Sequence, residues 1–225
     1  MNPFSDEKII QSWANNVSPW VKAIEQQQID SRKLVTDQAI IDAVTILPVA
    51  SVLDLGCGEG WLVRALSAKG LSVSGMDAIP AFIDKARELG AGNYQVMAYE
   101  ELGKSQLPQR YDAVVCNFSL LGQESVEQVF ANIPQALNSA GYFIVQTLHP
   151  CMHLGDALYC DGWREGAWAG FSDEFSDPAP WYYRTLSSWF NLFHRNGFII
   201  KTIQEPINPH TNKAASLIIV GCLSG

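Results

Sequence analysis

Residues 52–60 read Val-Leu-Asp-Leu-Gly-Cys-Gly-Glu-Gly, and this stretch decides the fold. A short apolar strand is predicted over residues 51–55 and an amphipathic helix over residues 61–68, with Gly56, Gly58 and Gly60 between them. Glycine suits such a turn because it adopts positive φ freely and lets a ligand lie against the backbone. The following helix directs unpaired N–H groups and its positive dipole end to the same place. The stretch therefore predicts a strand–turn–helix unit with a ligand site at the turn.

The same alternation of elements continues along the chain. Strands are predicted over residues 71–76, 94–97, 111–116 and 142–148, with helices over 80–89 and 124–137. Short apolar strands separated by helices indicate a buried parallel sheet with right-handed crossovers. A helix over 185–196 precedes two last strands, 198–204 and 216–222, whose joining loop has no room for a crossover helix. This final pair is therefore predicted to be antiparallel. We expect one doubly wound α/β domain spanning residues 1–225.

Two segments extend beyond this alternation. Helices predicted over residues 6–16 and 31–47 come before the first strand, and residues 1–48 are expected to form an N-terminal helical cap. Residues 149–184 are rich in Trp, Tyr, Phe, Gly, Asp and Pro and show no clear period. A long irregular stretch inside a compact domain is usually a functional loop. We expect this one to be a substrate lid inserted after the fifth strand.

Composition limits the classes of partner. The 225 residues carry a formal net charge of −8 and no basic run, which argues against a nucleic-acid partner. No segment approaches the ~20 apolar residues of a membrane span, and the N-terminus has acids where a signal peptide has bases. A cytoplasmic location without membrane contact is expected. Five scattered cysteines and the lack of ligand spacing among His, Asp and Glu predict neither a disulfide framework nor a metal site.

Asp77 adds a second feature to the glycine turn. It ends the predicted second strand, and a carboxylate there can accept hydrogen bonds from two ribose hydroxyls. The carboxyl ends of neighbouring parallel strands meet in the crevice where open α/β sheets bind ligands. Glycines and acid together predict an adenosine-containing cofactor. The alternative is a tight turn without a ligand, with Asp77 as an acid at a helix start.

The glycine spacing separates two kinds of cofactor. Nicotinamide enzymes show G-x-G-x-x-G, but here the spacing is G-x-G-x-G and Trp61 follows. Residues 52–60 resemble motif I of the class I S-adenosylmethionine (SAM) dependent methyltransferases. Residues 75–77 resemble the family's second motif, and residues 111–116 and 137–144 resemble its fourth strand and the entry to its fifth. The resemblance implies a seven-stranded sheet of order 3-2-1-4-5-7-6, with only strand 7 antiparallel.

The resemblance also implies cofactor contacts. The backbone of Gly56, Cys57 and Gly58 would line the methionine part of SAM, and Asp54 would hold this loop or the cofactor amine. The other implied contacts are Arg32 to the carboxylate, Asp77 to the ribose, Ala78, Tyr99 and Glu100 around the adenine, and Asn117 and Phe118 beneath the sulfonium. For Arg32 a solvated arginine is the alternative.

The sequence departs from the family at two places. Ala98 stands where members often have an Asp that contacts the adenine amine, so that contact would be lost or replaced by backbone. Residues 117–120 read Asn-Phe-Ser-Leu instead of the (D/N)PP(Y/F) of enzymes that methylate base or glutamine nitrogens, which argues against such substrates.

Candidates for the acceptor side follow the fifth strand. His149 could take a proton from the acceptor, or it could be a structural residue at the strand end. His153, His194 and His210 are expected to lie at loops or at a helix end. The substrate candidates in the insertion are Trp163, Arg164, Trp181, Tyr182 and Arg184. The aromatic residues could instead form a satellite core, and the arginines could form ordinary ion pairs.

These observations favour a SAM-dependent methyltransferase that acts on a small-molecule acceptor by direct displacement, with S-adenosylhomocysteine (SAH) as product. A SAM- or SAH-binding partner or regulatory protein without catalysis is the first alternative. An NAD(P)-dependent oxidoreductase is the second, and both the glycine spacing and the predicted antiparallel pair count against it. The acceptor and the oligomeric state are left open by the sequence.

Overall fold

The computed structural model describes residues 2–103, 107–152 and 157–224. A seven-stranded sheet runs in the order β3-β2-β1-β4-β5-β11-β8. Its strands are β1 (Ser51–Leu55), β2 (Ser72–Asp77), β3 (Asn93–Val96), β4 (Tyr111–Asn117), β5 (Leu137–Thr147), β8 (Phe198–Gln204) and β11 (Leu217–Leu223). Only β11 is antiparallel to its neighbours, β5 and β8. The predicted fold class, strand order and reversed final strand are confirmed.

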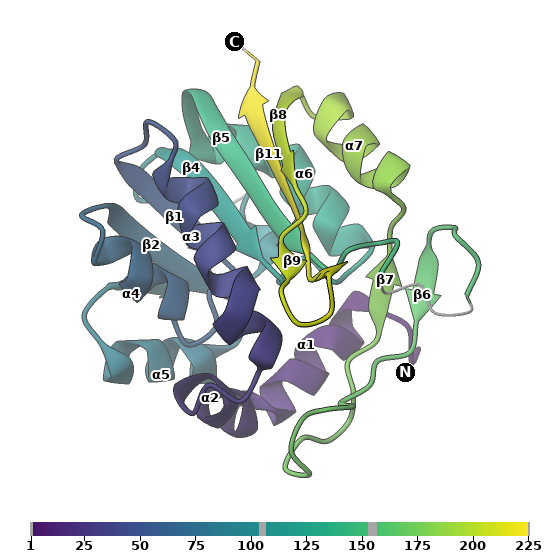
Figure 1. Ribbon diagram of the computed structural model, residues 1–225. Helices are drawn as coiled ribbons and strands as arrows, with labels where there is room; N and C mark the ends of the chain where they lie inside the picture. The colour runs from purple at the N-terminus through teal and green to yellow at the C-terminus, as the bar shows by residue number, and fades with distance from the viewer. Residues whose placement is uncertain (1, 104–106, 153–156, 225) are drawn as a thin grey trace.

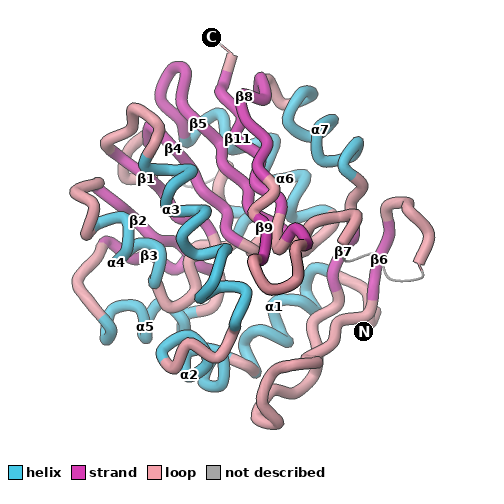
Figure 2. Tube along the Cα trace, in the orientation of Figure 1, coloured by secondary structure: helices cyan, strands magenta, loops and turns pink. Residues whose placement is uncertain are grey.

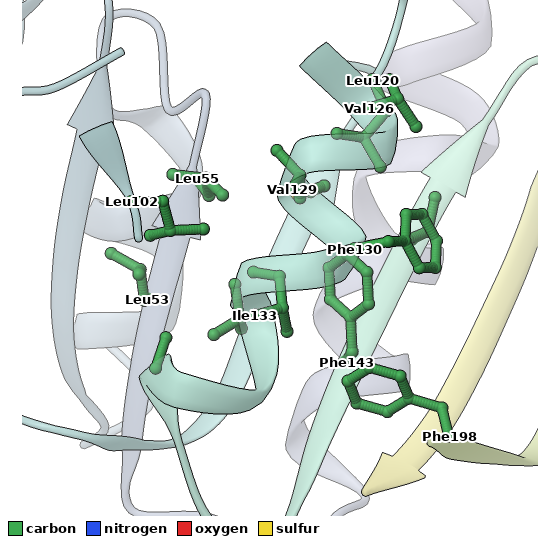
Figure 3. Packing of buried hydrophobic residues seen from close by; sticks show 14 of the residues in the cluster. Leu53, Leu55, Leu102, Leu120, Val126, Val129, Phe130, Ile133, Phe143 and Phe198 are labelled. Atoms are coloured by element: carbon green, nitrogen blue, oxygen red, sulfur yellow. The ribbon is translucent and has the colours of Figure 1, made fainter. Parts of the chain in front are cut away.

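Helices cover both faces of the sheet because alternate strand residues are apolar on each side. On one face α3 (Asp37–Thr45), α4 (Trp61–Ser67) and α5 (Pro80–Leu89) bury Ile40, Leu62 and Ile83. On the other face lie α6 (Glu124–Ala136) and α7 (Leu186–Arg195). Figure 3 shows Phe130 of α6 close to Phe143 of β5, with ring centroids 4.9 Å apart. Each such buried side chain contributes about 1.5–3 kcal/mol by leaving water.

The N-terminal segment contains more helix than predicted. The first helix, α1 (Asp6–Asn15), lies where one over residues 6–16 was predicted, and a second helix, α2 (Val17–Glu25), follows it that was not predicted. Pro19 lies in the first turn of α2, where a missing N–H costs little. The start of the second predicted helix is a π-helical turn, η1 (Arg32–Thr36). Such turns occur frequently at functional sites.

The insertion after β5 contains a hairpin of β6 (Gly162–Arg164) and β7 (Trp181–Tyr183), and a second hairpin of β9 (Ile207–Asn208) and β10 (Lys213–Ala214) precedes β11. Strands of two or three residues are too short to produce a period, which is why neither hairpin was predicted. A 3₁₀ turn, η2 (Tyr99–Glu101), follows β3.

The N-terminal helices and the insertion lie together at the carboxyl end of the sheet, as Figures 1 and 2 show. The Asn16 side-chain amide donates to the carbonyl of Ser176 at 2.7 Å and accepts from its N–H at 2.9 Å. Trp13 of α1 meets Trp168 of the insertion edge-on, with centroids 5.4 Å apart. None of the helices in the described part of the chain combines the length and apolar character that a membrane span requires.

Candidate cofactor and acceptor site

The glycine turn between β1 and α4 has one crowded side and one open side. Gly56 and Gly58 have φ of +80° and +54°, which an L side chain rarely adopts. A Cβ on Gly56 would lie 2.6 Å from the Tyr99 hydroxyl oxygen, so this side admits only glycine. Among the described residues other than its chain neighbours, a Cβ on Gly58 would have only Trp20 Nε1 within 4 Å, at 3.9 Å. The open side of Gly58 therefore gives a ligand access to the backbone.

Asp77 at the end of β2 is joined to this turn. Its Oδ2 accepts from the N–H of Gly58 and its Oδ1 accepts from the N–H of Ile79, both at 2.9 Å. Burial raises the pKa of the Asp77 carboxyl, and these two N–H groups oppose the rise. Each carboxylate oxygen can accept a second hydrogen bond. Asp77 thus fixes the turn and retains capacity for two hydroxyl groups.

Two buried carboxylates lie near the turn. Asp54 and Glu59 are 2% and 1% exposed, and Asp54 Oδ1 and both carboxylate oxygens of Glu59 lack a hydrogen-bond partner among the described residues. Burial raises the pKa of Asp54 well above its usual range, and the charges of Glu59 and Asp77 raise it further. Arg32 opposes that rise. Glu59 Oε1 lies 3.9 Å from Arg64 Nη2, whereas Asp54 Oδ1 has no hydrogen-bond partner among the described residues. Uncompensated buried charge is costly, so the Asp54 side of this region favours a ligand that carries positive charge.

Arg32 of η1 is held between two indoles. Its guanidinium carbon lies 4.6 Å from the ring centroid of Trp61 and 5.7 Å from that of Trp20. Its Nε donates to Asp37 Oδ1 at 2.9 Å, while its buried Nη2 has no hydrogen-bond partner in the described part of the chain. A guanidinium N–H group without a partner can donate a strong hydrogen bond to the carboxylate of a ligand.

Trp20 connects the turn to the insertion through a chain of aromatic ring contacts. Its centroid lies 5.0 Å from Trp13 and 6.4 Å from Phe171, and Phe171 packs against Trp168 at 5.5 Å. Trp20 is absent from the candidates predicted from the sequence, and the structure sets its indole nitrogen before Gly58. No local signal could have found this, because the contact joins residues 38 positions apart through α2, which was not predicted.

The remaining candidates for the cofactor lie at the ends of β2, β3 and β4. Ala78 follows Asp77 directly, and the Tyr99 hydroxyl donates to the carbonyl of Ser119 at 3.1 Å, which places its ring beside Gly56. Asn117 Oδ1 is buried without a hydrogen-bond partner among described residues. Phe118 has φ of +53°, a costly conformation for a bulky residue and one that clusters at functional sites.

Glu100 is not brought to this group. Its side chain is exposed, and it lines a surface depression with Gly103, Gln128 and Asn132. The turn η2 directs the Tyr99 side chain inward and leaves the next residue toward solvent. The structure therefore does not support the expected contact of the Glu100 side chain.

His149 is buried at the end of β5, 3% exposed. Its Nε2 lies 2.6 Å from Glu205 Oε1, and its Nδ1 accepts from the N–H of Cys151 at 3.2 Å. The N–H bond assigns the ring proton to Nε2, which then donates to Glu205. Both ring nitrogens therefore have hydrogen-bond partners within the chain, and the role of His149 as a base stays a prediction. His153 lies outside the described residues.

The two arginines of the insertion are committed to backbone carbonyls. Arg184, 4% exposed, donates to the carbonyls of Gly122 at 2.7 Å and Gln123 at 2.9 Å. Burial lowers the pKa of Arg184 to about 10, so it stays charged at neutral pH. Arg164 donates to the carbonyls of Trp163, Leu158 and Cys160. Both arginines, named as substrate candidates, thus donate to backbone carbonyls, and their contact with an acceptor stays a prediction.

The aromatic candidates of the insertion lie around the same hairpin. Trp163 and Tyr182 meet edge-on at 5.5 Å, and Trp181 lies 5.8 Å from Tyr183. Trp163 Nε1 donates to Gln123 Oε1 at 3.1 Å, and the Tyr182 N–H donates to the Leu121 carbonyl at 2.7 Å. The hairpin is thereby fixed to the loop between β4 and α6.

Comparison with known proteins finds a methyltransferase domain in part of the chain. Residues 52–141, which contain the glycine turn, Asp77 and strands β1 to β4, match a family model described as a methyltransferase domain. This part of the chain is similar to the methyltransferase domain of SAM-dependent enzymes. The open glycine turn, the free Arg32 N–H and the buried carboxylates fit the amino-acid part of this family's cofactor.

Individual relatives agree with this methyltransferase assignment. An uncharacterized methyltransferase of Schizosaccharomyces pombe is 24% identical over 178 residues, covering 76% of this chain and 67% of the relative. A ubiquinone biosynthesis O-methyltransferase of Rickettsia canadensis is 33% identical over 103 residues, covering 44% of this chain and 42% of the relative. The chain thus spans about two thirds of the first relative and less than half of the second.

A solved structure shares the whole methyltransferase fold. The 1,6-didemethyltoxoflavin-N1-methyltransferase of Burkholderia thailandensis, crystallised with 1,6-didemethyltoxoflavin and SAH, superposes with a TM-score of 0.64. The two chains are 15% identical, and the superposition covers 96% of this chain and 90% of the other. At this identity the comparison shows a common fold alone.

Proposed function

We propose that this methyltransferase transfers the methyl group of SAM to a small-molecule acceptor by direct displacement. The observation that carries the proposal is the open glycine turn, fixed by the Asp77 carboxylate, in a chain that contains a methyltransferase domain. Support for a small acceptor comes from the relatives named above, one of ubiquinone biosynthesis and one crystallised with 1,6-didemethyltoxoflavin. A nucleic-acid partner is disfavoured by the net charge of −8.

Binding of the cofactor is assigned to four groups of this chain. The Gly58 backbone accommodates the methionine part, and Arg32 Nη2 pairs with its carboxylate. Asp54 accepts from its ammonium group, while Asp77 accepts from the ribose hydroxyls. Bound SAM supplies an electrophilic methyl group on a sulfonium. The buried carboxylates stabilise that positive charge and hold the cofactor in one orientation.

The chain then has to align the acceptor and exclude water. We assign the acceptor side to the ends of β4 and β5, next to Asn117 and Phe118. The helical cap of residues 1–48 and the insertion of residues 149–184 cover this end of the sheet as one layer, linked by Asn16 and Ser176 and by Trp13 and Trp168. Alignment in a closed site is the main contribution to catalysis of such a displacement.

The experiment is a methyl-transfer assay that follows SAH formation from SAM with a panel of hydroxylated quinones and nitrogen heterocycles. The proposal expects acceptor-dependent SAH formation by the wild type and loss of it in Asp77→Ala. Tight SAM binding without turnover on any acceptor would favour the binding protein without catalysis. Absence of SAM and SAH binding would remove the proposal altogether.

A further inference from the structure

Four polar residues gather beneath η1, where β4 and β5 end and β11 begins. They are Thr36, Asn117, Gln146 and Ser216. Asn117 and Gln146 are register partners in adjacent parallel strands, so their side chains project from the same face. Two positions earlier on this face, Val115 and Ile144 are apolar and belong to the core under α3. The change from apolar to polar residues at the strand ends marks the end of the core.

Gln146 holds this group together. Its side chain is 1% exposed, and its Nε2 donates to the carbonyl of Thr36 at 3.2 Å and to Ser216 Oγ at 2.9 Å. Rotating the amide by half a turn would place Oε1 against the Thr36 carbonyl oxygen, which is repulsive. The orientation is therefore determined by the neighbours, with Nε2 toward Thr36 and Oε1 away from it.

Three oxygens of the group have no hydrogen-bond partner among the described residues. They are Gln146 Oε1, Asn117 Oδ1 and Thr36 Oγ1, each buried from solvent. Buried polar atoms in folded proteins are nearly always hydrogen-bonded, so such a cluster requires an explanation. The two amide oxygens can only accept, whereas the Thr36 hydroxyl can accept or donate. A ligand group that satisfies this cluster must therefore supply N–H or O–H hydrogens.

The arginines of the insertion do not add hydrogen-bond donors to this cluster of acceptor oxygens. Arg164 and Arg184 direct their N–H groups to backbone carbonyls, as described above. An anionic group placed at the cluster would face amide oxygens, and the buried Asp54, which is paired in register with Val115 of β4, projects from the same face of the sheet. Electrostatics thus disfavours carboxylates and phosphates at the strand ends.

We propose that Thr36, Asn117 and Gln146 form a subsite of the methyl acceptor that selects a neutral or cationic hydrogen-bond donor, such as an amide, amine or hydroxyl, over an anionic group. This inference rests on the proposed function, because it places the acceptor beside the cofactor. The π-helical turn η1 contributes by bringing Thr36 over the strand ends. Selection by buried acceptors is strong because the wrong ligand leaves them unpaired.

The test uses two pairs of probes with matched shapes, benzamide against benzoate and nicotinamide against nicotinate. Binding to the SAH-saturated protein is measured by saturation-transfer difference NMR at equal probe concentrations. We expect at least one amide to bind and its acid to bind about tenfold more weakly. In Gln146→Met, which keeps the side-chain length, the amide should bind about five- to tenfold more weakly. Gln135→Met, an exposed position on α6, is the matched control.

Calorimetry with SAH separates the possible failures. Gln146→Met should bind SAH within about threefold of the wild type, which shows that it is folded. If Gln146→Met fails to bind SAH, Thr36→Val is used in its place, and it should show the same loss of amide binding. The subsite is overturned if the acids bind as well as the amides, if the variant retains amide binding, or if no probe binds while SAH does. A wild type that fails to bind SAH would instead contradict the proposed function.

Discussion

The Asp77 carboxylate accepts a hydrogen bond from the backbone N–H of Gly58 at 2.9 Å, which ties the end of β2 to the open glycine turn. One acidic residue therefore fixes the turn and can also accept hydrogen bonds from the hydroxyl groups of a ligand. Because these two tasks share one side chain, its replacement has consequences that can be measured separately.

Asp77→Ala removes the acceptor of two backbone N–H groups and two predicted ribose contacts. Hydrogen bonds to a charged group contribute about 1.5–3 kcal/mol each, so SAH binding should weaken by at least about 50-fold. Calorimetric titration with SAH measures the change. Asp84→Ala, an exposed residue of α5, is the control and should bind SAH like the wild type. Unchanged affinity in Asp77→Ala would remove Asp77 from the cofactor site.

Trp20→Ala tests whether the indole before Gly58 contributes to ligand binding. Loss of a large aromatic wall and of its contact with Arg32 should weaken SAH binding by about tenfold. Trp20→Phe keeps an aromatic ring but loses the indole N–H. Its affinity for SAH should lie between those of the wild type and of Trp20→Ala. The same titration, followed by tryptophan fluorescence, should show quenching in the wild type and less of it in Trp20→Phe. Equal affinities in all three proteins would leave Trp20 a packing residue.

Asp6 of α1 caps the N-terminus of α6, a helix that begins 118 residues later. Its carboxylate oxygens accept from the N–H groups of Gln123 at 2.8 Å and Ser125 at 2.6 Å. Asp6→Ala should therefore lower the free energy of unfolding by about 1–2 kcal/mol, as loss of a helix cap does. Urea denaturation measures this value. Glu7→Ala, on the exposed side of the same turn, should change it by less than about 0.5 kcal/mol.

Asp112 makes stability depend on acid pH. Its carboxylate accepts from Asn138 Nδ2 at 2.7 Å, from the N–H groups of Ala50 and Ser51 at 3.0 Å, and from Ser51 Oγ at 2.9 Å. These hydrogen bonds, that from Asn138 foremost, lower the pKa of Asp112 to about 2 from an ordinary 3.8. The unfolded state therefore takes up the proton first, so the stabilisation is full above pH 3.8 and is lost as the pH falls through about 2.

Asp112→Ala should accordingly be less stable at neutral pH, by about 1–2 kcal/mol after allowance for solvent screening. The difference from the wild type should shrink as the pH falls from 4 toward 2. Urea denaturation at several pH values measures it. A difference that is the same at pH 2 and at pH 7 would show that the effect of the substitution is steric rather than electrostatic.

Local patterns in the sequence determined the sheet. The apolar strands and the short loop before residue 216 predicted a parallel sheet with an antiparallel final pair, and the resemblance to the methyltransferases implied the strand order. The structure confirms both. These features are readable because each depends on neighbouring residues, through glycine conformation, side-chain period or loop length. The same patterns named Asp77 and the turn, whose roles as ligand contacts stay predictions.

Only the tertiary structure decided which side chains meet. Gln146 contacts Thr36 across 110 positions, and Arg184 reaches the carbonyl of Gly122 across 62. The sequence predicted Arg184 as a substrate contact. In the structure its side chain is buried and donates to two backbone carbonyls just before α6. Hydrogen-bond partners so far apart leave no trace in local period or spacing. They are determined by how the cap, the insertion and the sheet pack against one another.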